Sequence, residues 1–325
     1  MKRGLVLGKF LPFHKGHARL IDFAESRCDR LTVLVCSTRD EEIPGEVRLG
    51  WIEEFYRRNE KIEAVHLRYD ERILPNTSVS SREVSRRWAV HLREHFPPFD
   101  LVFTSEEYGD FLAEFLGAEH LAFDLSKEIV PVSGTQIREN PFLYWDFLPD
   151  PVKPHFVKKV CLIGTESTGK SVLTERLARH FKTAFVPEMA RDIIEKTVEC
   201  TSDHLRQIAE LHARTILETV PKADKLLFVD TDVNITRSYS RFLFGEELRV
   251  EDWIERANRF DLYLYLEKDA DFVQDGTRLV QTERDLLDLS HRQIFAEKKI
   301  ELTGIGGDWE GRFERALQVV SEKFF

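Results

Sequence analysis

The chain contains few sulfur-bearing residues and no long uncharged apolar run. Among its 325 residues are four cysteines, Cys28, Cys36, Cys161 and Cys200, which form no C-x-x-C pair and have no histidine at metal-ligand spacing. A disulfide framework and a zinc site are therefore not expected. No stretch approaches the roughly 18 apolar residues of a membrane helix, and the N-terminus does not resemble a signal peptide. We therefore predict reduced thiols, a cytoplasmic location and no membrane partner.

The chain also lacks an excess of positive charge. Its formal net charge is −10, with 47 Lys and Arg residues against 57 Asp and Glu residues. Nucleic-acid binding usually requires a basic face or tail, so no nucleic-acid partner is expected. The sequence leaves open whether the chain acts alone or as a homo-oligomer.

Short apolar runs alternate with helical patterns in both halves of the chain, which is typical of βαβ units and parallel sheets. Between residues 140 and 155, Pro141, Pro149, Pro151 and Pro154 disfavour any long helix or strand. We place a domain junction there. The predicted fold class is α/β, with two doubly wound parallel-sheet domains covering residues 1–150 and 151–325.

The most specific motif is "GTESTGKS", which fits G-x-x-x-x-G-K-[ST] between an apolar strand and a helical pattern. In such a P-loop, backbone N–H groups surround phosphates, Lys170 reaches the β and γ groups, and the Ser171 hydroxyl binds Mg²⁺. A chance match in a Gly/Ser loop is the alternative. The predicted nucleotide-binding residues are Gly164, Thr165, Glu166, Ser167, Thr168, Gly169, Lys170, Ser171 and Val172.

Carboxylates follow two further strands of the second half. Asp230 ends "LLFVD" and is placed like the acidic residue that supports Mg²⁺ in P-loop proteins, although a simple strand-end turn would also explain it. In "VPEMAR", Glu188 could deprotonate an acceptor hydroxyl and Arg191 could hold a phosphoryl group. A salt bridge at a helix start is the alternative for this pair.

A candidate lid lies further along the chain. "DGTR" ends at Arg278 and is followed by Arg284, so a glycine hinge and two arginines could close over phosphates. An exposed loop is an equally good explanation.

In the first half, "GKFLPFHKGH" follows a strand and opens a helix, which brings His14 and His17 to a positive helix end. A metal pair and a structural turn are alternatives, but an anion site is favoured. A second hydroxyl-rich segment, "SGTQIR", carries Ser133, Thr135 and Arg138 at another expected helix start, where a plain N-cap is the alternative. Between them lies the strand-end loop "TSEEYGD", residues 104–110.

These two segments resemble the H-x-G-H and S-x-T-x-x-R signatures of the nucleotidyltransferase superfamily, in the form found in nicotinamide mononucleotide (NMN) adenylyltransferases. The order of the motifs along nearly the whole chain resembles the NadR-type bifunctional family, an adenylyltransferase fused to a ribosylnicotinamide kinase. This resemblance implies a Rossmann-like nucleotidyltransferase domain followed by a P-loop kinase domain.

The resemblance also implies residue roles. His14 and His17 would contact ATP phosphates, and Lys9 and Arg138 would neutralise the leaving pyrophosphate. Ser133 and Thr135 would lie along the same phosphate track, in an ATP site that also includes Gly8 and Phe10. In the kinase half, Lys170 and Ser171 would hold ATP and Mg²⁺, and Asp230 would be the metal-associated carboxylate. Asp232, Glu188 and Arg191 would lie near the ribosyl group.

The implied reactions phosphorylate ribosylnicotinamide to NMN and adenylylate NMN to NAD, with ATP as the co-substrate of both and Mg²⁺ as cofactor. Repressor members of the family carry an N-terminal helix-turn-helix segment, whereas here the first expected strand begins within a few residues of Met1, so DNA-binding regulation is not expected. Two alternatives remain open. One is a nucleotide sensor with little turnover, and the other is the same chemistry on a different nucleoside.

Overall fold

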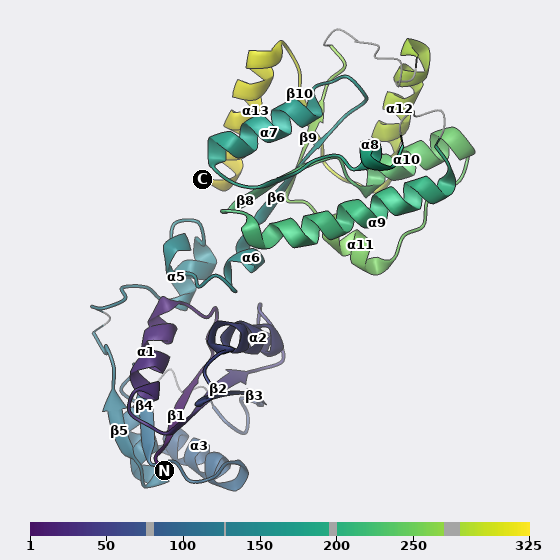
Figure 1. Cartoon of the computed structure of the whole chain (residues 1–325). Helices are drawn as coiled ribbons and strands as arrows, with labels where there is room; N and C mark the ends of the chain where they lie inside the picture. Colours follow the sequence, from purple (N-terminus) through teal and green to yellow (C-terminus); the bar gives the residue numbers. More distant parts are fainter. Residues whose placement is uncertain (76–80, 127, 195–199, 270–279) are drawn as a thin grey trace. The chain divides into compact units, whose positions relative to one another are not determined.

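The computed structural model describes residues 1–75, 81–126, 128–194, 200–269 and 280–325. The chain divides into two compact units, Met1–His155 and Phe156–Phe325. The boundary expected from the proline-rich segment lies just before this division. Each unit is a parallel five-stranded sheet with helices against it (Figure 1), so the predicted α/β class with two doubly wound domains is confirmed.

The first unit has the strand order β3-β2-β1-β4-β5, and every neighbouring pair is parallel. Its strands are β1 (Arg3–Gly8), β2 (Arg30–Ser37), β3 (Ile62–Arg68), β4 (Leu101–Thr104) and β5 (Glu119–Ala122). Its helices are α1 (Lys15–Glu25), α2 (Gly45–Tyr56), α3 (Arg82–His95), α4 (Gly109–Leu116) and α5 (Gly134–Glu139), followed by the short η1 (Trp145–Phe147) and α6 (Lys153–Phe156).

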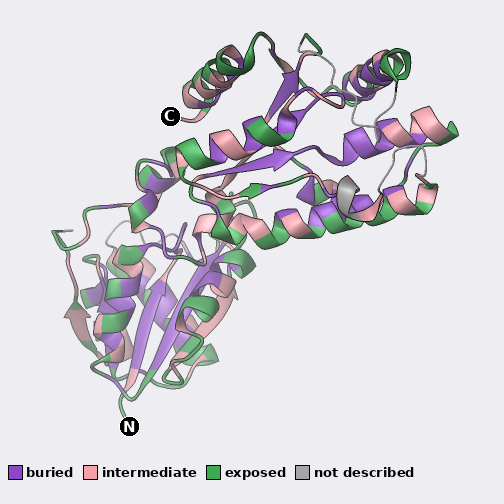
Figure 2. Cartoon of the chain, turned by 45° about the horizontal axis from the view of Figure 1, so that its top comes forward, coloured by how far each residue is buried: buried purple, intermediate pink, exposed green. Residues whose placement is uncertain are grey.

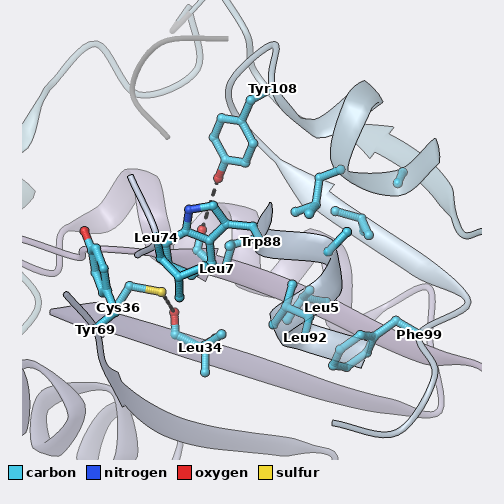
Figure 3. Close-up of a cluster of buried hydrophobic side chains, with 14 residues drawn as sticks. Leu5, Leu7, Leu34, Cys36, Tyr69, Leu74, Trp88, Leu92, Phe99 and Tyr108 are labelled. Atoms are coloured by element: carbon cyan, nitrogen blue, oxygen red, sulfur yellow. Dashed lines mark hydrogen bonds between the residues drawn. The ribbon is translucent and has the colours of Figure 1, made fainter. Parts of the chain in front are cut away.

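One face of this sheet packs against α3 and α4. Apolar side chains of β1 and β2 meet Trp88 and Leu92 of α3 there, together with Tyr108 (Figure 3). The hydroxyl of Tyr108 donates to the carbonyl of Leu7, 3.4 Å away, at the end of the central strand. Packing of this core therefore holds the segment after β4 against the end of β1, which is where the order of the strands reverses and ligands bind in such sheets.

Two similar side-chain units flank the central strand at the carboxyl ends of the other strands. On one side, the Ser37 hydroxyl lies 2.7 Å from Nε2 of His66. On the other side, Thr104 Oγ1 lies 2.9 Å from Nε2 of His120 and 2.7 Å from the carbonyl of Glu106. In each case the helix that comes next in the chain starts at a glycine, and the backbone of this glycine lies close to Nε2 of the histidine.

The second unit has the order β10-β9-β6-β8-β7, again all parallel. Its strands are β6 (Lys158–Ile163), β7 (Phe185–Val186), β8 (Leu226–Asp230), β9 (Leu262–Leu266) and β10 (Thr303–Ile305). Its helices are α7 (Lys170–Phe181), α8 (Ala190–Ile193), α9 (Ser202–Thr219), α10 (Val233–Phe244), α11 (Asp252–Ala257), α12 (Gln281–Glu297) and α13 (Trp309–Phe324), with a short η3 at Val220–Lys222.

The central strands β6 and β8 of this sheet are almost wholly buried (Figure 2). Each contains a continuous apolar run, residues 160–163 in β6 and 226–229 in β8, as expected for parallel strands covered on both faces. Their carboxyl ends carry the P-loop and Asp230, so the strand pairing alone brings these two distant segments together.

Candidate active sites

The first candidate site is a cavity at the carboxyl ends of β1 and β4. Nearly every residue that the sequence singled out in this half contributes to its wall, although the segments lie more than a hundred positions apart. These wall residues include Gly8, Lys9, Phe10, His14, His17, Ser133, Thr135 and Arg138. The cavity is also lined by the loop from Thr104 to Glu106 and by Tyr108.

His14 and His17 stack face to face at the start of α1, with ring centroids 3.7 Å apart. His14 is the N-cap residue, and its Nδ1 accepts from the N–H of Gly16 at 3.1 Å. Nδ1 of His17 accepts in turn from the N–H of His14 at 3.4 Å. Because both Nδ1 atoms are acceptors, the neutral rings carry their protons on Nε2. The pair therefore combines imidazole N–H donors with a helix N-terminus, which suits an anion.

Lys9 is held at this site by two residues that the sequence analysis missed. Its ammonium lies 3.1 Å from Oε1 of Glu41, a carboxylate that is only 8% exposed. Arg48 is fully buried, pairs with the same carboxylate, and donates to the backbone carbonyl of Lys9. The one available signal was that Arg48 and Ile52 occupy the same buried face of α2, so a charge interrupts an otherwise apolar stripe.

Ser133 and Arg138 have structural contacts as well as places in the cavity wall. Ser133 is the N-cap of α5, its Oγ accepting from the N–H of Gln136 at 3.3 Å, so the N-cap alternative describes this residue. Arg138 donates to the carbonyl of Leu11 and lies 3.4 Å from Thr135 Oγ1. These contacts tie α5 to the loop after β1, so the two signature segments form one site.

The second candidate site is built on the P-loop between β6 and α7. Gly169 has φ of 85°, a left-handed conformation that glycine adopts without strain, and α7 starts at the next residue. The ammonium of Lys170 is buried and donates to the carbonyl of Thr165, 3.0 Å away, within the loop. Thr168 Oγ1 donates to the same carbonyl at 2.9 Å. The loop is therefore ordered by its own side chains around the space that phosphates occupy in such motifs.

Asp230 and Asp232 are close in sequence but have different surroundings. Asp230 ends β8, is fully buried, and its Oδ2 accepts from Ser171 Oγ at 2.5 Å. Asp232 is the N-cap of α10, accepting from the N–H groups of Asn234 and Ile235 at 3.0 Å each. Burial raises the pKa of Asp232 to about 6. Asp230 lines the cavity beside the P-loop. Asp232 holds the start of a helix and is not among the residues that line this cavity, and its place near the ribosyl group stays a prediction.

The remaining residues of the kinase prediction are placed as follows. Glu188 lines the same cavity as Asp230, after β7, together with Gly164, Glu166 and Lys170. Val172 points to solvent on α7, with 66% of its surface exposed. Arg191 belongs to α8, but its side chain is not among those the structure describes. Arg278 and the rest of "DGTR" lie outside the described residues.

Two buried arginines hold the P-loop from outside. Nε of Arg284, on α12, donates to the carbonyl of Glu166 at 2.9 Å, so this arginine lies against the loop itself. Arg312, on α13, donates to the carbonyl of Thr168 at 2.6 Å and to that of Glu267 at 2.9 Å. The sequence analysis missed Arg312, because no motif surrounds it and its partners are far away in the chain.

Burial also changes the titration of two histidines near this site. Loss of solvent lowers the pKa of His212, on α9, to about 4, and that of His291, on α12, to about 3. Both rings are therefore neutral near pH 7. Within the described ranges, no three His, Cys, Asp or Glu side chains form a metal-binding group. None of the described helices combines the length and apolar character needed to span a bilayer.

The family model of an AAA domain matches residues 159–312. The trifunctional NAD biosynthesis/regulator protein NadR of Escherichia coli is 32% identical over 98% of this chain and 82% of its own length. A nicotinamide-nucleotide adenylyltransferase of Methanocorpusculum labreanum is 29% identical over 32% of this chain and 59% of its own length.

The fold is also that of a solved protein. A crystal structure of a NadR protein in complex with NAD and AMP-PNP matches with a TM-score of 0.79 and 23% identity, covering 99% of this chain and 96% of that one. The likeness to the Escherichia coli protein extends across both units and both candidate sites. The chain therefore belongs to the NadR family of NAD biosynthesis proteins.

Proposed function

We propose that this chain makes NAD in two ATP-dependent steps, one in each unit. The C-terminal unit transfers the γ-phosphoryl group of ATP to the 5′-hydroxyl of ribosylnicotinamide, giving NMN and ADP. The N-terminal unit then lets the phosphate of NMN attack the α-phosphorus of a second ATP, giving NAD and pyrophosphate. The observation that carries the proposal is the presence of two separate cavities, each at the carboxyl edge of its own sheet, one lined by Lys170 of the P-loop and the other by Lys9, His14, His17 and Arg138.

In the kinase step, Lys170 binds the transferred phosphate and Glu188 accepts the proton of the attacking hydroxyl. Glu188 suits this role because its side chain lines the same cavity as Lys170. Arg191 and Arg278 would add positive charge near the phosphates. Little covalent chemistry is required of the protein, because phosphoryl transfer depends mainly on positioning and on charge stabilisation.

The donor set beside the P-loop fits Mg²⁺. Ser171 Oγ and Asp230 Oδ2 are adjacent oxygens, and Mg²⁺ binds proteins through one or two such oxygens together with phosphates and water. These two residues would hold the ion, which would neutralise charge on the phosphates of ATP.

In the adenylylation step, the cluster of Lys9, His14, His17 and Arg138 stabilises the charge that grows on the leaving pyrophosphate. Its donors are fixed before the substrate binds, by the helix start and by the buried Arg48 and Glu41. Such preorganised donors lower the barrier because no reorganisation is needed during the reaction. No covalent enzyme intermediate is required.

The test is a coupled assay on the purified protein with ribosylnicotinamide and Mg-ATP, in which NMN and NAD are followed separately by chromatography. We expect NMN to appear first and NAD to follow, with ADP and pyrophosphate as the respective co-products. If neither NMN nor NAD forms, the chain is a binder and the proposal is wrong. A clear preference for a non-pyridine nucleoside in the same assay would overturn the assignment of substrate.

A further inference from the structure

The cavity beside the P-loop has a charged end and an apolar end. The cavity has a volume of about 110 Å³. Glu166, Lys170, Glu188 and Asp230 form its charged end. Side chains of α9 and α10 form half of the rest, and three of them, Leu205, Ile208 and Ile235, are aliphatic. A phosphoryl acceptor bound here would have its reacting group near the charges and its remainder among α9 and α10.

Among the described residues that α9 contributes to the cavity wall, Leu205 and Ile208 are aliphatic and His212 is polar. It follows Leu205, Ile208 and Ala209 at helical spacing on α9 and precedes Ile216, so it occupies a core-facing position of the helix. It lines the cavity, yet it is only 5% exposed. A histidine in such a stripe is the one sequence signal for this residue.

The two ring nitrogens of His212 have different surroundings. The ring donates a hydrogen bond to the backbone carbonyl of Asp230, at the end of β8. Nε2 is the ring nitrogen that finds no partner among the described residues, so Nδ1 is the donor. This bond fixes the neutral tautomer and leaves Nε2 as a hydrogen-bond acceptor.

A buried acceptor without a partner destabilises the folded protein, and sites that recognise a polar ligand carry such groups in their unliganded form. We infer that Nε2 of His212 accepts a hydrogen bond from the nucleoside that is phosphorylated in this cavity. His212 is thereby a specificity-determining residue of the kinase unit.

The inference rests on the proposed kinase function and specifies how its acceptor substrate is recognised. A ribosylnicotinamide molecule offers three kinds of donor away from its 5′-hydroxyl: the 2′-hydroxyl, the 3′-hydroxyl and the carboxamide N–H. A neutral imidazole acceptor can bind any of these, and it does not repel a cationic pyridinium ring. Its link to Asp230 also ties nucleoside binding to the strand end that faces the phosphates.

The experiment compares His212→Phe, which keeps a ring but removes the acceptor, with His212→Gln, which retains an amide oxygen. In the full chain, we expect His212→Phe to raise the KM for ribosylnicotinamide about tenfold with less than a threefold change in kcat. For His212→Gln, the increase in the KM for ribosylnicotinamide should be at most half as large on a logarithmic scale. The KM for ATP and the adenylylation of supplied NMN should stay within twofold of the unsubstituted protein.

The matched control is His204→Phe. His204 lies two turns earlier on α9 and does not line the cavity, so its replacement should leave the KM for ribosylnicotinamide within twofold. An unchanged KM in a folded His212→Phe protein overturns the inference, as does a Gln variant no better than Phe. If the unsubstituted protein phosphorylates no nucleoside, the proposed function itself is wrong.

Substrate analogues provide a test that needs no variant. With the unsubstituted protein, the 2′-deoxy, 3′-deoxy and N,N-dimethylcarboxamide analogues each lack one kind of donor. We expect the KM for one of these analogues to be about tenfold higher than that for ribosylnicotinamide. For that analogue, the His212→Phe variant and the unsubstituted protein should have the same KM. If all three bind like ribosylnicotinamide, no donor meets His212 and the inference is overturned.

Discussion

His291 shows how the environment of one residue changes the pH dependence of stability. The ring is fully buried on α12, and neither ring nitrogen has a hydrogen-bond partner among the described residues. Burial, and secondarily the charge of Lys170, lowers its pKa from 6.5 to about 3. Above pH 6.5 the ring is neutral in the folded and unfolded states and contributes no pH dependence. Below pH 6.5 only the unfolded state binds the proton, so stability falls as the pH decreases towards 3.

We predict that His291→Leu removes this part of the acid sensitivity. Between pH 6 and pH 5 the free energy of unfolding of the variant should fall by roughly 1 kcal/mol less than that of the unsubstituted protein. Denaturant titrations of both proteins at the two pH values measure the difference. Equal losses would show that the ring takes up its proton within the folded structure. Asp232 and His212 titrate in the same range, but they do so in both proteins and their effects cancel in the comparison.

Asp230 and Asp232 show what a motif leaves undecided at the residue scale. Both follow one apolar run, and the sequence placed both near the substrates. Asp230 is the last residue of β8 and faces the cavity, whereas the chain then turns and Asp232 caps α10. Which carboxylate faces a cavity depends on where the strand ends, and a difference of two residues was enough to separate their roles.

At the scale of elements, α2 follows β2 and α4 follows β4. Each of these helices begins where the backbone passes close to a histidine side chain. A Cβ atom at Gly109, the first residue of α4, would overlap His120 Nε2 and Thr104 Oγ1. The same hydrogen-bonded unit continues through His120 Nδ1 to Asp110, 2.6 Å away. Glycine is required here for space, since its backbone is helical.

Gly109→Ala should therefore destabilise the N-terminal unit by about 1–3 kcal/mol, as overpacked sites generally do. Gly50→Ala is the matched control, because Gly50 lies inside α2 with no neighbouring atom within 4 Å of an added Cβ. This replacement should raise stability by up to about 1 kcal/mol, because alanine favours the helix. Thermal unfolding of the two variants tests the pair, and a Gly109→Ala protein as stable as Gly50→Ala would contradict the structure.

Several elements were predictable from local patterns. Apolar residues recur at helical spacing along α9, Ser202–Thr219, and the P-loop lies between a buried strand and a helix as its motif requires. The strand in "TAFVPEMAR" is only two residues long, Phe185–Val186, because it pairs at the edge of the sheet with β8 alone. The extent of such an edge strand is decided by its neighbour, which local sequence does not report.

At the scale of the whole molecule, each unit has its own candidate site, and this separation predicts separable activities. Lys170→Ala should abolish the kinase step while leaving the adenylylation of supplied NMN. His17→Ala should abolish adenylylation while leaving the phosphorylation of ribosylnicotinamide. Both rates are measured on each full-length variant, and circular dichroism serves as the check on folding. If either replacement removed both activities from a folded protein, independent sites would be the wrong description.

The sequence by itself determined the fold class, the family and the segments expected to bind phosphates. Those segments are recognisable because a phosphate is held by consecutive backbone N–H groups and nearby side chains. The residues that such a site needs are therefore adjacent in the sequence and form a short motif. Only the tertiary structure identified Arg48, Arg312 and His212, whose partners lie 39, 144 and 18 positions away. Such contacts depend on the order of the strands and on the face of each helix that is buried, and these are properties of packing over the whole unit.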